Sequence, residues 1–202
     1  MQNSTSIEQY KKELRQQMRQ ERKALSSAQQ LTAGNALLEH LKSIASFNTA
    51  NSIALYLTSD GEIDPISVIE HCWSLGKRVY LPVLDPDKHN QLLFVEYRQD
   101  TPMCFNKYQI SEPATPYQNT INADELDLVL LPLVAFDQQG SRMGMGGGYY
   151  DRSFAFINTQ QQPCTPVLIG LAHALQQVSK LNVESWDIPL TAIVTDGEIH
   201  NA

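Results

Sequence analysis

Gly140-Ser-Arg-Met-Gly-Met-Gly-Gly-Gly-Tyr-Tyr-Asp-Arg152 is the stretch that decides the fold of this chain, and it holds five of the 10 glycines. Glycine at this density costs conformational entropy on folding, so the backbone is needed here without side chains. The apolar residues 126–133 before the stretch predict a buried strand, and residues 149–157 after it predict a helix. Strand, glycine loop and helix start together predict a phosphate-binding loop, with a long flexible turn as the alternative.

The side chains around the glycines favour a binding site over a plain turn. Arg142 and Arg152 bracket the loop, and Asp151 stands at the predicted helix start, where a carboxylate can hold a metal beside a phosphate. The loop is not a Walker A motif, because no Lys-Ser/Thr pair follows its last glycine. It also lacks G-x-G-x-x-G in register and comes late in the chain, which argues against a dinucleotide fingerprint.

Length, composition and charge limit the class of protein. The 202 residues, 42% of them hydrophobic, fit a single domain over residues 1–202 with an ample core. The net charge of −7 argues against a general nucleic-acid binder. No apolar run approaches the roughly 20 residues of a membrane span, and residues 1–6 lack the apolar core of a secretory signal. We therefore expect a soluble, cytoplasmic, monomeric domain of enzyme size.

The cysteines give no framework for disulfides or metals. Cys72, Cys104 and Cys164 are odd in number and scattered along the chain. Neither a disulfide pattern nor a metal-ligand spacing results, so we expect reduced thiols.

Two amphipathic helices are predicted at the start of the chain. The first spans residues 6–25, with a buried stripe made of Ile7, Tyr10, Leu14, Met18 and Leu25. A basic stripe lies directly beside it and comprises Lys11, Arg15, Arg19 and Arg22. That stripe is either a solvated face or, at Lys11 and Arg15, the rim of whatever the helix covers. Ser26 and Ser27 offer an N-cap for a second helix to about residue 46, with Leu31, Leu37, Leu38, Leu41 and Ile44 inside.

Strands and helices alternate along the rest of the chain. Strands are predicted over residues 52–58, 78–83, 91–98, 126–133, 166–172 and 192–195. The helix that starts at Asp64-Pro65 ends at Gly76, and a strand-helix-strand unit of this length favours a parallel pair. Residues 99–122 are the least regular part, and the residues after 195 look turn-like. The pattern predicts one three-layer α/β/α domain with a mainly parallel, Rossmann-like sheet.

Read as one string, residues 142–152 resemble the signature of the 5-formyltetrahydrofolate cyclo-ligases, also called 5,10-methenyltetrahydrofolate synthetases. The resemblance implies an enzyme that cyclises 5-formyltetrahydrofolate to 5,10-methenyltetrahydrofolate, releasing ADP and phosphate. ATP would be the co-substrate, Mg²⁺ the cofactor, and small molecules the only implied partners. Phosphoryl transfer needs mainly positioning and charge stabilisation, which suits a chain that offers glycines, lysine, arginine and aspartate but no Ser-His-Asp set.

The resemblance also implies roles for individual residues. ATP binding is implied for Lys11, Arg15, Arg142, Met143, Gly144, Met145, Gly146, Gly147, Gly148, Tyr149 and Tyr150. Folate binding is implied for Leu57, Glu62, Met145, Gly146, Gly147, Gly148 and Tyr149. The implied magnesium ligands are Asp151 and Asp187. Met145 and Gly147 stand where some family members carry basic residues.

Several alternatives stay open from the residues themselves. Glu62 can equally be a solvated loop glutamate. Asp151 can be a carboxylate that stabilises the start of a helix, and Asp187 can be a charged residue on the surface. His173, just past a strand end, is either catalytic or a structural polar residue. The whole chain could be a non-catalytic nucleotide- or folate-binding module. It could also be a sugar-phosphate isomerase-like enzyme, which shares a phosphate loop and needs no ATP.

Overall fold

The computed structural model describes residues 2–114, 116–117, 119–159, 166–182, 184 and 186–202. Within these ranges Cys72 and Cys104 are free thiols, as the sequence predicts, and Cys164 lies outside them. None of the helices in the same ranges has the length and apolar character needed to cross a membrane.

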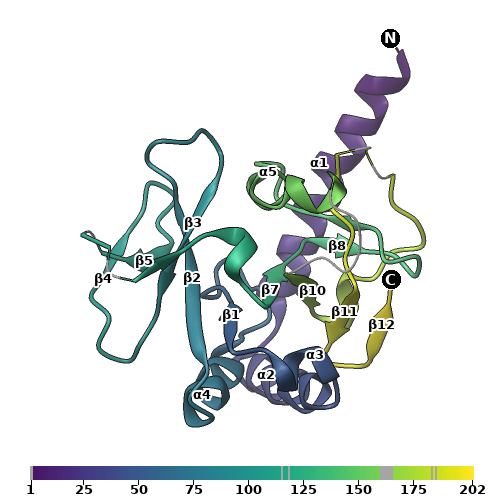
Figure 1. Cartoon of the computed structure of the whole chain (residues 1–202). Helices are drawn as coiled ribbons and strands as arrows, with labels where there is room; N and C mark the ends of the chain where they lie inside the picture. The colour runs from purple at the N-terminus through teal and green to yellow at the C-terminus, as the bar shows by residue number, and fades with distance from the viewer. Residues whose placement is uncertain (1, 115, 118, 160–165, 183, 185) are drawn as a thin grey trace.

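An eight-stranded sheet forms the centre of the molecule (Figure 1). In spatial order its strands are β12 (Ile199–Asn201), β11 (Ala192–Thr195), β10 (Val167–Ala172), β7 (Leu128–Pro132), β1 (Ser52–Ala54), β2 (Arg78–Leu84), β3 (Leu92–Glu96) and β6 (Thr120–Ile121). The run from β11 to β2 is parallel throughout, whereas β12 and β3 are antiparallel to their neighbours. The mainly parallel sheet is therefore confirmed, and the strand predicted over residues 91–98 is β3, which runs antiparallel to β2.

The strand order reverses between β1 and β7. From β1 the chain adds β2, β3 and β6 on one side, and from β7 it adds β10, β11 and β12 on the other. In open α/β sheets, ligands bind at such a switch point, in the crevice beyond the carboxyl ends of the strands. The loops that follow β1 and β7 contain Leu57, Glu62 and the glycine loop, so the topology alone brings these segments to one place.

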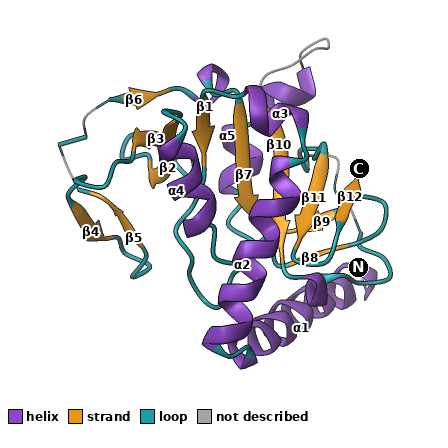
Figure 2. Cartoon of the chain, turned by 90° about the horizontal axis from the view of Figure 1, so that it is seen from below, coloured by secondary structure: helices purple, strands orange, loops and turns teal. Residues whose placement is uncertain are grey.

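Helices cover both faces of the sheet and make the predicted three-layer arrangement (Figure 2). On one face, α2 (Ser27–Lys42), α3 (Ala45–Thr49) and α4 (Ile66–Ser74) pack around a buried cluster that includes Leu37 and Leu130. On the other face, α5 (Tyr149–Ser153) and the 3-10 turn η2 (Ala155–Thr159) pack around a second cluster that includes Phe94, Val129 and Phe154. The parallel strands are thus buried on both sides, which explains their continuous apolar runs.

Helix α1 (Gln2–Ala24) lies at the carboxyl edge of the sheet, apart from both faces. Its Leu14 and Met18 are buried against the loop after β7 and the two-stranded hairpin of β8 (Ala135–Phe136) and β9 (Arg142–Met143). This packing places Arg15 of the basic stripe next to the glycine loop that follows β9. Lys11 and Arg15 are both half-buried, so they lie at the rim of the surface that α1 covers, as predicted.

Three residues predicted to be buried are exposed. Ile7 and Tyr10 are 37% and 44% exposed, because the N-terminal turns of α1 extend beyond the body of the molecule (Figure 1). Leu31 of α2 is 64% exposed, since it lies on the side of the helix away from the sheet. Conversely, Arg22 from the basic stripe is fully buried.

Several predicted elements have different bounds. The helix over 26–46 is two helices, because α2 ends at Lys42 and the Ser43 hydroxyl donates to the His40 carbonyl at 2.7 Å. The helix over 149–157 is only five residues long, since Phe154 leaves helical geometry where its ring enters the core. The irregular stretch contains β4 (Met103–Phe105) and β5 (Ser111–Pro113), and the turn-like end contains β12. Two further 3-10 turns are η1 (Ala123–Glu125) and η3 (Ala174–Gln176).

Candidate functional site

The backbone of the glycine loop alternates in hand. Gly146 and Gly148 have φ of 96° and 64°, whereas Gly147 between them is outside the positive-φ region. Such alternation makes successive N–H groups converge into an anion-binding concavity. Within the described part of the chain, no protein group accepts a hydrogen bond from the N–H of these three glycines. The loop therefore offers three adjacent donors to a ligand.

Long side chains hold the carbonyl groups of the same loop. Arg15 Nε donates to the Gly144 carbonyl at 3.0 Å. The Gly147 carbonyl accepts from Arg152 Nη1 at 2.7 Å and from Asn90 Nδ2 at 3.4 Å. The Gly144 and Gly147 carbonyls are therefore paired within the protein, whereas the N–H groups of the three glycines are not paired within the described residues.

Glycine is needed at two of these positions for different reasons. At Gly146 the left-handed φ disfavours any other residue, and a Cβ would lie 3.3 Å from Arg15 Nη2. At Gly147 the φ is ordinary, but a Cβ would lie 2.7 Å from the Tyr149 ring. A side chain at position 147 is therefore costly because it would collide with Tyr149, and not because of the backbone conformation.

The two cations predicted on α1 have separate partners. Arg15 contacts the glycine loop as described, but Lys11 Nζ donates to Glu184 Oε1 at 2.8 Å. Lys11 thus binds the segment that leads to Asp187. Of the predicted pair, Arg15 therefore contacts the glycine loop, and Lys11 contacts Glu184, three residues before Asp187.

Asp151 and Asp187 lie near each other, because the backbone next to Asp187 is hydrogen-bonded to the Asp151 carboxylate. Asp151 Oδ1 accepts from the Ile188 N–H at 3.4 Å, and Asp187 Oδ2 accepts from the Glu184 N–H at 2.8 Å. Asp151 is also ion-paired with Arg142, whose side chain is 7% exposed and whose Nε has no hydrogen-bond partner among the described residues. No group of three or more His, Cys, Asp or Glu that could hold a metal occurs among the described residues. Two carboxylates fit Mg²⁺ where phosphate and water complete its shell.

Glu62 occupies an unusual environment for a loop carboxylate. Burial raises the pKa of Glu62 to about 7, although the charge of Arg22 and the Ser59 N–H favour the ionised form. That N–H donates to Glu62 Oε2 at 3.1 Å. Glu62 is half-buried, and the effect of burial on its pKa outweighs both favourable partners, which argues against the solvated-loop alternative.

The tyrosines after the glycines connect the two loops. Burial, followed by the charge of Glu62 in the loop after β1, raises the pKa of Tyr150. The Tyr150 ring also stacks with Phe154, with centroids 6.4 Å apart. Tyr149 turns the other way, and its hydroxyl pairs with the Tyr108 hydroxyl at 2.8 Å. The loops after β1 and β7 thus share one site, walled by the turn between β4 and β5.

The sequence model of the 5-formyltetrahydrofolate cyclo-ligase family matches residues 7–196. The chain belongs to this family of ligases. The 5-formyltetrahydrofolate cyclo-ligase of Escherichia coli (strain K12) is 41% identical over 182 residues, which cover 90% of this chain and 98% of the relative. The enzyme of the same name from Haemophilus influenzae is 42% identical over 186 residues, which cover 92% and 97%.

Solved structures of cyclo-ligase relatives have the same fold. The NMR structure of Aquifex aeolicus 5,10-methenyltetrahydrofolate synthetase has a TM-score of 0.77 at 26% identity, covering 95% of this chain and 92% of that one. The 5,10-methenyltetrahydrofolate synthetase from Mycoplasma pneumoniae has a TM-score of 0.71 at 23% identity, covering 92% and 98%. The second likeness concerns the fold alone. The matched family and the names of the Escherichia coli and Haemophilus influenzae relatives favour a ligase over the isomerase-like and non-catalytic alternatives.

Not every residue implied by the family resemblance presents its side chain to the site. Met143 is 6% exposed and packs beneath α1, so only its backbone is available to a ligand. Met145 is exposed, and Leu57 packs at the margin of the α2-side cluster. His173 is buried, and its N–H donates to Gln176 Oε1 at 2.8 Å in the cap of η3, which favours the structural alternative for this residue.

The sequence alone did not identify residues that are distant in the chain from the glycine loop but contact the cyclo-ligase-like site. Tyr108 and Asn90 come from loops that carry no motif, and only the tertiary contact with the glycine loop identifies them. Asp60 and Arg22 are further examples. The one available signal was a positive charge on the side of α1 next to its apolar stripe, which is where a buried cation would stand.

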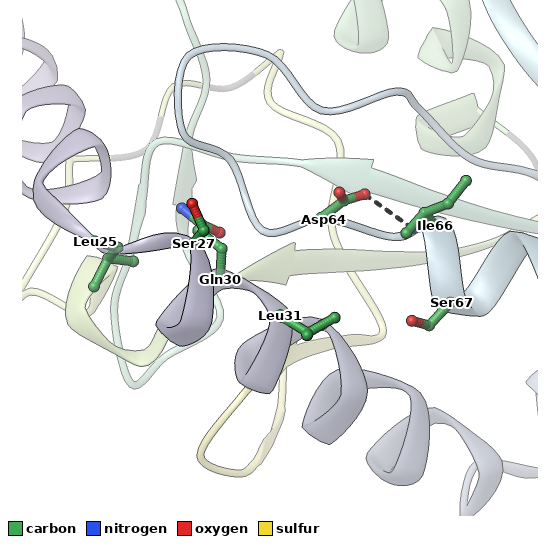
Figure 3. Close-up of a pocket in the computed structure, with 8 residues that line it drawn as sticks. Leu25, Ser27, Gln30, Leu31, Asp64, Ile66 and Ser67 are labelled. Atoms are coloured by element: carbon green, nitrogen blue, oxygen red, sulfur yellow. Dashed lines mark hydrogen bonds between the residues drawn. The ribbon is translucent and has the colours of Figure 1, made fainter.

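Two cavities lie outside the glycine loop. One of about 310 Å³ lies between the starts of α2 and α4 and is lined by Leu25, Ser27, Gln30, Leu31, Gly34, Asp64, Ile66 and Ser67 (Figure 3). None of the predicted site residues lines it. Another of about 430 Å³ runs along the polar side of α1 and is lined by Lys12, Arg15, Gln16, Arg19, Gln20 and Lys23. Only Arg15 belongs to both this groove and the predicted site.

Proposed function

We propose that this protein catalyses the ATP- and Mg²⁺-dependent cyclisation of 5-formyltetrahydrofolate to 5,10-methenyltetrahydrofolate, with release of ADP and phosphate. The observation that carries the proposal is the meeting of two unlike loops at the β1–β7 switch point. One loop offers three adjacent N–H donors, and the other offers the desolvated carboxylate of Glu62. Donors suit phosphate groups, and a carboxylate suits the paired N–H groups of a pterin ring.

The chemistry needs both ligands at once. A formamide carbonyl is a poor electrophile, and its oxygen is a poor leaving group. Transfer of the γ-phosphoryl group of ATP to the formyl oxygen removes both obstacles. N10 of the folate then attacks the formyl carbon, the carbon–oxygen bond breaks, and the oxygen leaves with phosphate while N10 loses its proton. N10 and the formyl group belong to the same folate molecule, so the attack is intramolecular, and the site would contribute by holding the conformer in which N10 lies against the formyl carbon.

Each loop has a separate task in this reaction. Gly146, Gly147 and Gly148 would bind the phosphates through their N–H groups, with Arg15 fixing the loop and adding positive charge. Glu62 would orient the pterin, and Tyr150 beside it would form one wall of the folate site. Met145 and Gly147 supply no side-chain charge, so the backbone donors carry most of the phosphate contact within the loop.

Asp151 and Asp187 would hold Mg²⁺ together with the phosphates. The ion would neutralise charge on the transferred phosphoryl group. Asp151 is also paired with Arg142. The Arg142 guanidinium would therefore lie close enough to stabilise either the Asp151 carboxylate or the phosphates. The remaining contribution of these residues is orientation: they fix the 187–188 segment against α5 through the bond from the Ile188 N–H.

Purified protein tests the proposal directly. The methenyl product absorbs in the near ultraviolet, so its formation from 5-formyltetrahydrofolate, ATP and Mg²⁺ can be followed continuously. We expect product only when all three are present. Binding of folate or nucleotide without product would instead indicate a non-catalytic module.

A further inference from the structure

Arg22 is an arginine in the core of the protein. It is fully buried, although it belongs to the basic stripe of α1. Its Nη1 donates to the Leu133 carbonyl at 3.3 Å and its Nη2 to the Asp60 carbonyl at 3.2 Å. Leu133 directly follows β7, and Asp60 lies in the turn after β1. The guanidinium therefore ties together the two loops that form the candidate site.

The turn that Arg22 holds is strained and closely packed. Asp60 has φ of 57°, a left-handed conformation that non-glycine residues rarely adopt. Its carboxylate pairs with Arg19, with Lys23, and at 3.7 Å with Arg22 Nη2. Gly61 follows with φ of 75°, and a Cβ there would lie 3.0 Å from the backbone of Arg22. The end of α1 thus fixes a backbone conformation that would otherwise be unfavourable.

Glu62 is the next residue along, so its direction depends on this turn. Four groups in the described part of the chain influence its charge. Arg22 faces it from α1, Asp60 from its own turn, Tyr56 from the segment after β1, and Tyr150 from α5. Arg22 is the one cation among them. It favours the ionised carboxylate, whereas Asp60 disfavours it.

We propose that Arg22 is a positioning residue for folate recognition: it holds the Asp60–Gly61 turn so that Glu62 faces the pterin as a carboxylate. The inference rests on the proposed function, since it concerns the folate half of that site. Its charge matters as well as its hydrogen bonds, because a buried carboxylate without a nearby cation takes up a proton more readily. Arg19 and Lys23, which pair with the same Asp60 at the surface, lack this role.

The test measures binding of 5-formyltetrahydrofolate by calorimetry from pH 5.5 to 9, without nucleotide, alongside product formation. Wild-type affinity should fall below about pH 7, where Glu62 protonates. In Arg22→Met this fall should move up by about one pH unit, the scale of losing an opposite charge within roughly 4–6 Å. Arg22→Lys keeps the charge but not the planar fork, so affinity should drop about tenfold with the pH midpoint unchanged.

Two further variants make the result specific. Asp60→Asn removes a negative neighbour of Glu62, so the midpoint should move to lower pH, opposite to Arg22→Met. Lys23→Gln is the matched control, because Lys23 pairs with the same carboxylate at the surface; binding should change less than about threefold. ATP affinity should stay at the wild-type value in all four.

The outcomes separate the inference from the proposed function. If Arg22→Met and Asp60→Asn weaken folate binding equally at every pH, the inference is overturned and Arg22 has only a structural role. Wild-type protein that binds the folate with the predicted pH midpoint but forms no product would overturn the reaction and not the inference. Wild-type protein that binds no 5-formyltetrahydrofolate would overturn both. If Arg22→Met does not fold, the other two variants still test the inference. The pH midpoint of folate binding should move to lower pH in Asp60→Asn and stay unchanged in Arg22→Lys.

Discussion

The turn over residues 57–62 and the loop over residues 140–151 follow neighbouring strands, yet they are built in opposite ways. The turn is packed against α1, and its key group is a side chain, Glu62, that the protein desolvates. In the glycine loop, the key groups are backbone N–H atoms, and the side chains around it serve to occupy its carbonyls. The contrast matches the two proposed ligands, since phosphates are bound by converging donors and a pterin edge by one oriented carboxylate.

Filling the glycine loop should give the largest effect. In Gly147→Val a branched side chain would overlap the Tyr149 ring. In Gly148→Val the side chain would meet the Arg152 guanidinium, and the residue would need a φ of 64°. We expect ATP use to be abolished in both, while the protein stays folded, as far-ultraviolet circular dichroism would show. Unchanged ATP affinity in either variant would show that these N–H groups are not the phosphate site.

Changing the carboxylate of the turn should affect the other ligand. Glu62→Gln converts one acceptor into a donor and removes the charge, so folate binding should weaken by about 1.5–3 kcal/mol, the range for hydrogen bonds to charged groups. ATP affinity, measured separately by calorimetry, should be almost unchanged. Equal losses for both ligands would mean that the two regions are not independent.

The same variant should stabilise the protein at high pH. Burial raises the pKa of Glu62 above its unfolded value, so the wild-type carboxyl stabilises the fold while protonated and loses that contribution as the pH rises through about 7. Glu62→Gln should therefore match wild type near pH 4 and exceed it by about 2–3 kcal/mol at pH 8, at 1.36 kcal/mol per pKa unit. Urea unfolding at both pH values measures this. A gain that is equal at both would contradict the desolvated state of Glu62.

The metal carboxylates beside the glycine loop should give a smaller effect. Asp151→Asn and Asp187→Asn should each raise the Mg²⁺ concentration for half-maximal rate several-fold, about 1 kcal/mol, with folate affinity unchanged. Only Asp151→Asn should also lower the melting temperature, because it leaves the nearly buried Arg142 without its partner. Mg²⁺ titration curves that superimpose on wild type would remove both residues from the site.

The sequence by itself determined the elements and the identity of the central loop. Continuous apolar runs predicted the parallel strands, because strands buried on both faces have no polar side, and clustered glycines marked a backbone that had to stay uncovered. The N-cap at Ser26 was equally readable, since its capping box with Gln29 is a local contact. Local signals of this kind depend on neighbours within a few residues.

Tertiary structure alone decided which polar groups become unusual. Arg22 and Arg19 are one turn apart on α1 and look alike in sequence, yet Arg22 is buried between the loops after β1 and β7 and Arg19 is not. Glu62 gains its raised pKa from desolvation by segments distant in the chain. Burial and long-range electrostatics depend on how the elements pack, and no local pattern records that packing.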